Sequence, residues 1–104
     1  MPRTPLFHPL ARQELFAASD YTALHWSEEF AAEFEVEFHK LVARILEDPM
    51  RYRARHPGDH RRVNLKRFPY HLIYFPHEGT IWIVALAHHS QRPFYWRDRL
   101  GVAL

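Results

Sequence analysis

The chain has 104 residues, no cysteine and a formal net charge of +2, with 47% hydrophobic and 15% aromatic side chains. This length suits a single domain, spanning residues 1–104, with a hydrophobic core of its own. The lack of cysteine excludes disulfides, zinc sites with thiolate ligands and cysteine nucleophiles. No apolar run approaches the roughly 20 residues of a membrane helix, and the N-terminus lacks a signal peptide's apolar stretch. We therefore expect a cytoplasmic protein with no membrane partner.

Charge is divided unevenly along the chain. Residues 1–49 carry four basic and nine acidic side chains, whereas residues 50–104 carry ten basic and three acidic ones. A basic half favours a polyanionic or acidic partner through counterion release and electrostatic steering. The pattern is equally consistent with neutralisation of one half by the other inside the fold, because segregation along a chain need not become segregation on a surface.

The acidic half predicts a short strand followed by two helices. Residues 4–8 are apolar enough for an edge strand, and a helix is expected from Pro9 to about Leu24. Ser27 is a suitable N-cap for a second helix, which we expect to end at Asp48-Pro49 because the residue before a proline is driven out of helical geometry. Apolar side chains recur along this second helix at helical spacing: Phe30, Phe34, Phe38, Leu41 and Ile45.

The basic half begins with a loop at 50–60 and then changes to a period of two. Val63 and Leu65 alternate with polar residues, which is typical of a half-buried strand. Residues 70–75 and 80–88 are β-branched and aromatic runs, joined by a four-residue hairpin loop at 76–79. The last run is apolar on both faces, which favours a central strand. We expect an α+β fold of order β-α-α-β-β-β, with a helical hairpin packed on a small antiparallel sheet.

Motifs along nearly the whole chain resemble the RelE/ParE toxins of bacterial type II toxin–antitoxin systems. Residues 7–15 are similar to the family's opening, where a strand runs into a helix that begins near a small and an acidic residue, and Asp48-Pro49 is also typical. The motif R-F-P-Y at 67–70 leads into a strand, and the tail from His88 to Arg99 has the pattern H-x₃-R-P-x-Y-W-x-x-R. The resemblance implies a cognate antitoxin as partner.

The apolar stripe of the second helix has two interpretations within this resemblance. We favour the hydrophobic core, which such a stripe usually forms. In the family, however, helix faces and neighbouring sheet edges also receive the antitoxin. An apolar groove with a basic rim would suit an amphipathic antitoxin segment.

In the nuclease branch of the family, the toxin enters the ribosomal A site and cleaves mRNA. That reaction needs a base for the 2′-hydroxyl proton, positive charge for the phosphorane and an acid for the leaving oxygen. The resemblance implies these roles for basic side chains on the sheet and for a tyrosine near the C-terminus. The candidates for catalysis are Arg67, His71, His88, Arg92 and Tyr95. The candidates for contact with nucleic acid or another target are Arg51, Arg53, Arg55, Lys66, Trp96 and Arg99.

In the ParE branch, the toxin poisons DNA gyrase and is not an enzyme. We favour this branch because His71 stands directly after a strand tyrosine, where RelE places an arginine. The acidic second helix that follows residues 26–29 is also similar to ParE. Three interpretations stay open: a gyrase inhibitor, a ribosome-dependent endoribonuclease, and a decayed member that binds antitoxin without toxicity.

Several candidates also have a purely structural interpretation. A histidine at a strand end, such as His88, is more often hydrogen-bonded than catalytic, and the arginines at 51–55 suit a solvated loop as well as a phosphate site. Tyr95 and Trp96 either stack on a base or anchor the tail on the sheet. Two pairs of histidines could suggest a metal site. His56 and His60 have the i, i+4 spacing of a helical metal pair, but the Pro57 and Gly58 between them disfavour a helix. The adjacent histidines 88 and 89 would point to opposite faces of a strand, so they are not expected to bind one metal ion. We therefore expect no metal and no cofactor.

Overall fold

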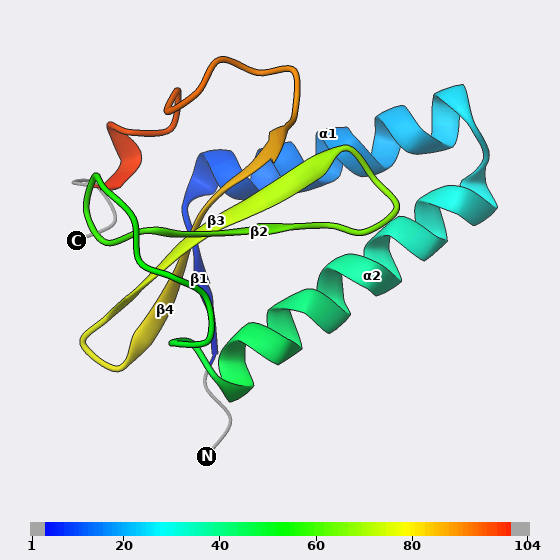
Figure 1. Cartoon of the computed structure of the whole chain (residues 1–104). Helices are drawn as coiled ribbons and strands as arrows, with labels where there is room; N and C mark the ends of the chain where they lie inside the picture. The colour runs from blue at the N-terminus through cyan, green and yellow to red at the C-terminus, as the bar shows by residue number, and fades with distance from the viewer. Residues whose placement is uncertain (1–3, 101–104) are drawn as a thin grey trace.

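The computed structural model describes residues 4–100, and these residues form the expected elements in the expected order (Figure 1). The α+β class and the order β-α-α-β-β-β are confirmed. In chain order the elements are β1 (Leu6–Phe7), α1 (Pro9–His25), α2 (Glu28–Glu47), β2 (Arg61–Asn64), β3 (Tyr70–His77) and β4 (Thr80–His88).

The four strands form one sheet of order β1-β4-β3-β2. β2, β3 and β4 make the predicted antiparallel meander, and β4 lies centrally, between β1 and β3. β1 differs from the expectation of an antiparallel sheet because it pairs in parallel with β4, with Leu6 opposite Trp82 and Phe7 opposite Ile83. Two helices and the antiparallel strands β2 and β3 separate β1 from β4 in the chain, and β4 then runs in the direction of β1. The whole sheet is therefore mixed.

The hairpin between β3 and β4 is tighter than predicted. The strands stay paired to His77 and Thr80, so the loop is Glu78-Gly79 and not the four residues 76–79. Both loop residues have positive φ, 50° at Glu78 and 76° at Gly79, as a type I′ turn requires. Pro76 is tolerated inside β3 because β2 stops opposite Tyr74 and leaves this end of β3 without a neighbour on that side.

The helices begin and end at the capping and proline residues that the sequence predicts. Pro9 occupies the first turn of α1, where its missing N–H costs nothing, and the ring of His8 accepts a hydrogen bond from the Leu10 N–H. The Ser27 hydroxyl accepts from the Phe30 N–H and caps α2. Asp48 ends α2 as expected.

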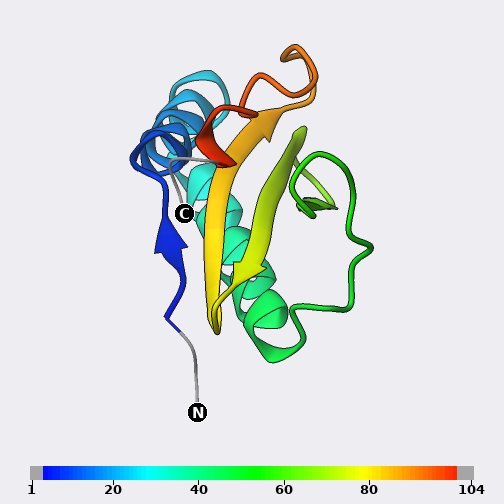
Figure 2. The same ribbon diagram turned by 90° about the vertical axis from the view of Figure 1, so that its left-hand side faces the viewer.

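Both faces of the sheet are covered, by different kinds of structure. α1 and α2 lie on one face, where the α2 stripe packs into the larger core cluster with Phe34 and Phe38 fully buried. On the other face, Trp96 and Leu100 pack over Ile73 and other outward residues of β3 and β4. The segment after β4 thus returns across the sheet toward the 50–60 loop (Figure 1), and Figure 2 shows the helices on the opposite side of the sheet from that loop. The interpretation of the α2 stripe as core is confirmed.

Candidate functional site

A cleft of about 460 Å³ lies on the sheet face away from the helices, between the 53–60 loop and the C-terminal tail. Its floor is the outward side of β3 and β4, including Ile73 and Ala87. The sixteen lining residues include four arginines and four histidines but no aspartate or glutamate. Those eight residues are Arg53, Arg55, His56, His60, Arg62, His71, His89 and Arg92.

The four cleft arginines are Arg53 and Arg55 from the loop, Arg62 from β2 and Arg92 from the tail. All four are exposed. Within residues 4–100, none of them lies within 4.0 Å of a carboxylate. The cleft is therefore a concentration of positive charge that the fold leaves without a neutralising partner, and such a surface attracts anions.

His71 forms part of the cleft floor, and its ring stacks on His89 with 5.4 Å between ring centroids. This contact follows from the register, which places His71 opposite Ala87 and so beside residue 89. Burial, with the nearby charges of Arg62 and His89, lowers the pKa of His71 to about 4. Its Nδ1 atom is buried and has no hydrogen-bond partner among the described residues. His71 is accordingly neutral near pH 7.

The loop and the tail are held together by His60, which is 2% exposed. Its Nδ1 lies 2.7 Å from the Pro57 carbonyl oxygen, and its ring packs edge-on against Trp96 at 4.6 Å between centroids. Burial lowers the pKa of His60, so this contact is made by a neutral ring. The walls of the cleft are thus tied to one another through packed aromatic side chains.

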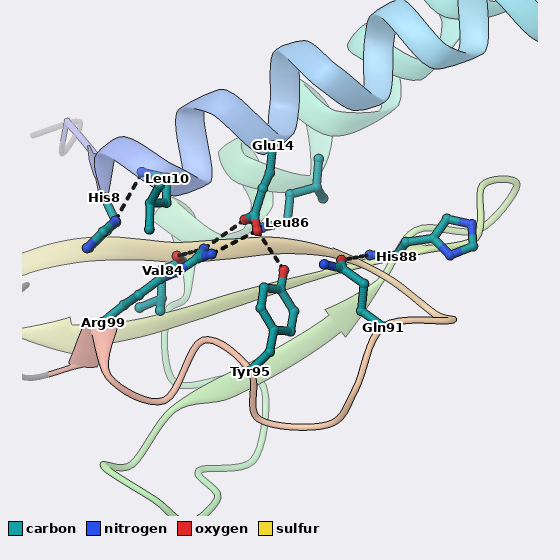
Figure 3. Close-up of polar contacts among 9 residues, drawn as sticks. All are labelled: His8, Leu10, Glu14, Val84, Leu86, His88, Gln91, Tyr95 and Arg99. Atoms are coloured by element: carbon teal, nitrogen blue, oxygen red, sulfur yellow. Dashed lines mark hydrogen bonds and ion pairs between the residues drawn. The ribbon is translucent and has the colours of Figure 1, made fainter.

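Glu14 of α1 fixes the tail from the other side, and the sequence did not single it out. Figure 3 shows Tyr95 and Arg99 of the tail pointing toward its carboxylate. The carboxylate accepts from both terminal nitrogens of Arg99, at 2.9 and 3.0 Å, and from the Tyr95 hydroxyl at 2.8 Å. It also accepts from the backbone N–H of Leu86, and Arg99 donates to the carbonyl of Val84. One glutamate thereby joins α1, the tail and the part of β4 that extends beyond β1.

This Glu14 cluster also determines the state of Tyr95. Burial and the hydrogen bond to Glu14 raise the pKa of Tyr95 well above its ordinary value of 10. Its hydroxyl is a donor committed to Glu14, and Tyr95 is also one of the residues that line the cleft. Tyr95 is therefore suited to positioning the tail rather than to accepting a proton.

Two of the candidate catalytic residues lie outside the cleft. Arg67 pairs with Glu33 at 3.0 Å and Glu37 at 3.7 Å on α2, and so belongs to the helix-covered side. His88 packs edge-on against Tyr70, with its Nδ1 2.6 Å from the Ser90 hydroxyl. The five candidates are therefore not brought together. Of these five, His71, Arg92 and Tyr95 line the cleft.

The candidate contact residues are separated as well. Arg53 and Arg55 line the cleft, whereas Lys66 lies beside α2, where its backbone N–H donates to Glu37. Trp96 is 3% exposed, so it anchors the tail and offers no face to a base. Arg99 is paired with Glu14 and its side chain is 12% exposed, so its contact with a target stays a prediction that this geometry does not favour.

Two kinds of structural feature are missing from residues 4–100. No group of three or more histidine or acidic side chains there could hold a metal ion. No helix in that range is long and apolar enough to cross a membrane.

Comparison with known proteins bears on the family and on the fold. Residues 6–93 match the family described as "ParE toxin of type II toxin-antitoxin system, parDE". No curated protein sequence matches the chain. A chain of the solved structure "Chromosomal ParDE TA system from P. aeruginosa" is similar, with a TM-score of 0.73 and 16% sequence identity, over 84% of this chain and 96% of that chain. At that identity the structural likeness shows the fold, whereas the family match covers most of the sequence.

Proposed function

The chain belongs to the family of ParE toxins of type II toxin–antitoxin systems, and from this we propose that it arrests bacterial growth by inhibiting DNA gyrase through protein–protein contact. We further propose that it acts in the cytoplasm and that a cognate antitoxin neutralises it. The competing activity within the wider RelE/ParE group is cleavage of mRNA on the ribosome.

The observation that carries the choice is the separation of the residues that RNA cleavage would need. General acid–base chemistry requires donors and acceptors within hydrogen-bonding reach of the same scissile phosphate. Arg67 and His88 lie outside the cleft, and the Tyr95 hydroxyl is committed to Glu14. His71 stays in the cleft as a neutral ring beside four arginines, which is suited to binding an anion but lacks a positioned partner for proton transfer. This arrangement supports a toxin that acts without a nuclease centre.

For the antitoxin, the best-supported docking surface lies at the tip of the helical hairpin. Tyr21 and Trp26 are 54% and 73% exposed there, although large aromatic side chains are usually more buried. They border a pocket of about 200 Å³ lined mainly by aromatic and apolar side chains. Arg67, which also lines it, is already paired with Glu33 and Glu37. An apolar pocket of this kind suits an amphipathic antitoxin segment that inserts one hydrophobic side chain.

The target is tested by inducing the protein in a bacterium and following DNA breaks and mRNA integrity in parallel. Gyrase inhibition predicts growth arrest with stabilised DNA breaks and intact transcripts, and purified gyrase should lose supercoiling activity when the protein is added. Codon-specific cuts in ribosome-bound mRNA would overturn the proposal in favour of a nuclease. Normal growth with soluble, folded protein would identify a member that has lost toxicity.

Antitoxin docking is tested separately, by measuring binding of the cognate antitoxin to Trp26→Ser and to a control, Met50→Ser. Met50 is 66% exposed but lies after α2, away from the hairpin tip. We expect Trp26→Ser to weaken binding by at least about 10-fold, the loss expected for a central aromatic anchor. Equal affinities for the two variants would place the antitoxin elsewhere.

A further inference from the structure

The basic cleft has no role in gyrase inhibition as proposed above, because protein–protein contact with gyrase does not require the toxin to hold a nucleic acid. We propose that this cleft binds a single-stranded nucleic acid, with its phosphates on the four cleft arginines and one base stacked on Phe94.

The first argument is the convergence of arginines on one site. Within residues 4–100, three of the eleven arginines have a carboxylate within 4.0 Å, and the other eight, which include the four of the cleft, have none. The four cleft arginines differ from the other unpaired ones because they line the same concavity, which they reach from three segments of the chain. Grouping like charges costs free energy unless an anion occupies the space between them. Arginine's planar fork of donors matches the geometry of a phosphate.

The second argument concerns the shape of the ligand. Proteins that read duplex DNA usually insert a helix into the major groove. α1 and α2 carry three basic and eight acidic side chains in total, so they would repel a duplex. The positive charge lies instead in a concave site of about 460 Å³ on a sheet face. A recessed site of this kind admits a flexible strand more readily than a rigid double helix.

The third argument is the position of Phe94. Its ring is 45% exposed at the cleft, although the neighbouring Trp96 is buried. The Phe94 backbone has a φ of 62°, a region that bulky residues rarely adopt. Trp96 and His60 lie beside the ring, at 5.7 and 6.3 Å between centroids, and the Arg97 guanidinium lies over it, 6.0 Å from its centroid. An exposed aromatic face beside phosphate-binding arginines is the arrangement with which proteins hold single strands through base stacking.

An acidic peptide is the other polyanion to consider. A peptide that docks tightly usually inserts an apolar anchor into a pocket. The cleft is lined mainly by arginines and histidines, and Phe94 projects at its edge without forming such a pocket. The lining therefore favours a ligand that offers many phosphates and a flat base.

Binding is tested with the purified protein and a short fluorescent oligothymidylate, by anisotropy over a range of salt concentrations. If all four arginines contact phosphates, the slope of log K against log salt concentration should be about −3, since each contact on a single strand contributes about −0.7. This assay contains no gyrase, so its failure would leave the proposed growth arrest untouched. A slope near zero, or no binding at low salt, would refute the proposal.

Substitutions locate the site. Arg53→Gln, Arg55→Gln and Arg92→Gln should each weaken binding several-fold and bring the slope closer to zero by about 0.7. Arg44→Gln makes the same change of charge at an exposed position on α2 and should have little effect. If Arg44→Gln weakens binding as much as the cleft variants do, the attraction is only the general charge of the protein and the cleft is not the site.

The base contact is tested with Phe94→Leu, which removes the aromatic face but keeps an apolar side chain. We expect binding to weaken by about 5- to 100-fold with the salt slope unchanged, because stacking contributes no counterion release. Unchanged affinity would remove Phe94 from the site.

Three further ligands test which chemical feature of the single strand the cleft recognises. Duplex DNA, a polyglutamate of equal charge and a single thymidine monophosphate should all bind at least about 10-fold more weakly than the single strand. Equal binding of the duplex would contradict recognition of a single strand. Equal binding of polyglutamate would identify a general anion site, and equal binding of the monophosphate would reduce the site to a nucleotide pocket. Each of these results would overturn the proposal as stated.

Discussion

The attachment of the C-terminal tail by Glu14 makes the sharpest prediction about stability. Glu14→Gln keeps the size of the side chain but removes the charge that Arg99 and Tyr95 share. Hydrogen bonds to charged groups contribute about 1.5–3 kcal/mol each, whereas loss of one member of a well-buried ion pair costs about 3–5 kcal/mol. The side chains of Arg99 and Glu14 are 12% and 20% exposed, so water partly screens the pair. Since glutamine can still accept one of these bonds, we expect a loss of about 2–4 kcal/mol.

The measurement is urea denaturation of wild type, Glu14→Gln and a control, Glu47→Gln. Glu47 is exposed at the end of α2, so the same loss of charge there should change the free energy of unfolding by less than about 0.5 kcal/mol. A double-mutant cycle of Glu14→Ala with Arg99→Ala should give a coupling energy above about 1.5 kcal/mol. Additive effects in the cycle, or a loss below about 1 kcal/mol for Glu14→Gln, would refute the interpretation of this cluster as the attachment point of the tail.

Glu14→Gln should also change the affinity of the cleft for a nucleic acid. The direction of that change distinguishes an effect of charge from an effect of tail position. Removing a negative charge should by itself strengthen the binding of a polyanion. Loosening the tail should instead weaken binding, because Arg92 and Phe94 reach the cleft on that segment. We expect Glu14→Gln to lower the affinity for the oligothymidylate and Glu47→Gln to leave it equal or slightly higher. Higher affinity in both variants would show that Glu14 does not position the cleft.

The remaining predictions concern stability. Phe34→Ala and Ile83→Ala should each cost about 2–5 kcal/mol in chemical denaturation, because both side chains are buried in the larger core cluster, whereas Val36→Ala, at an exposed position of α2, should cost less than about 1 kcal/mol. Gly79→Ala should lower the free energy of unfolding by about 1–2 kcal/mol, because alanine is strained at the positive φ of this position. No atom lies within 4 Å of the added carbon, so a larger loss would contradict an effect of the backbone alone. His71 takes up a proton near pH 4 when folded and near pH 6.5 when unfolded, so the unfolded state binds more protons between these values. Stability should therefore fall by about 1–2 kcal/mol between pH 7.5 and pH 5 on account of His71, and a His71→Leu variant should show a correspondingly flatter pH profile.

Local signals in the sequence determined most of the fold. The Ser27 cap, the stop at Asp48-Pro49 and the 3.6-residue period of the α2 stripe depend on residues close together in the chain, so the helix ends could be predicted closely. A strand that is apolar on both faces must be covered on both, which placed β4 in the centre of the sheet. The ordered motifs were sufficient to indicate the family, because each belongs to one such local element.

The sequence could not decide what depends on distant residues meeting. The parallel pairing of β1 with β4 joins residues that two helices and two strands separate in the chain, and the tight Glu78-Gly79 turn follows from how far the strand pairing extends. Nothing in the sequence indicated the partners of Glu14, because they lie more than 70 positions away, at Leu86, Tyr95 and Arg99.

The charged residues illustrate the same difference between what the sequence indicates locally and what depends on contacts between distant residues. The sequence identified a basic half, but tertiary structure decided which arginines are neutralised. Arg67 and Arg99 pair with glutamates of the acidic half across the fold, whereas Arg53, Arg55 and Arg92 line a cleft that has no carboxylate among its lining residues. Coulombic interaction depends on distance in space and on burial, and neither can be read from position along the chain. The family could therefore be predicted from local patterns, whereas the candidate site required the structure.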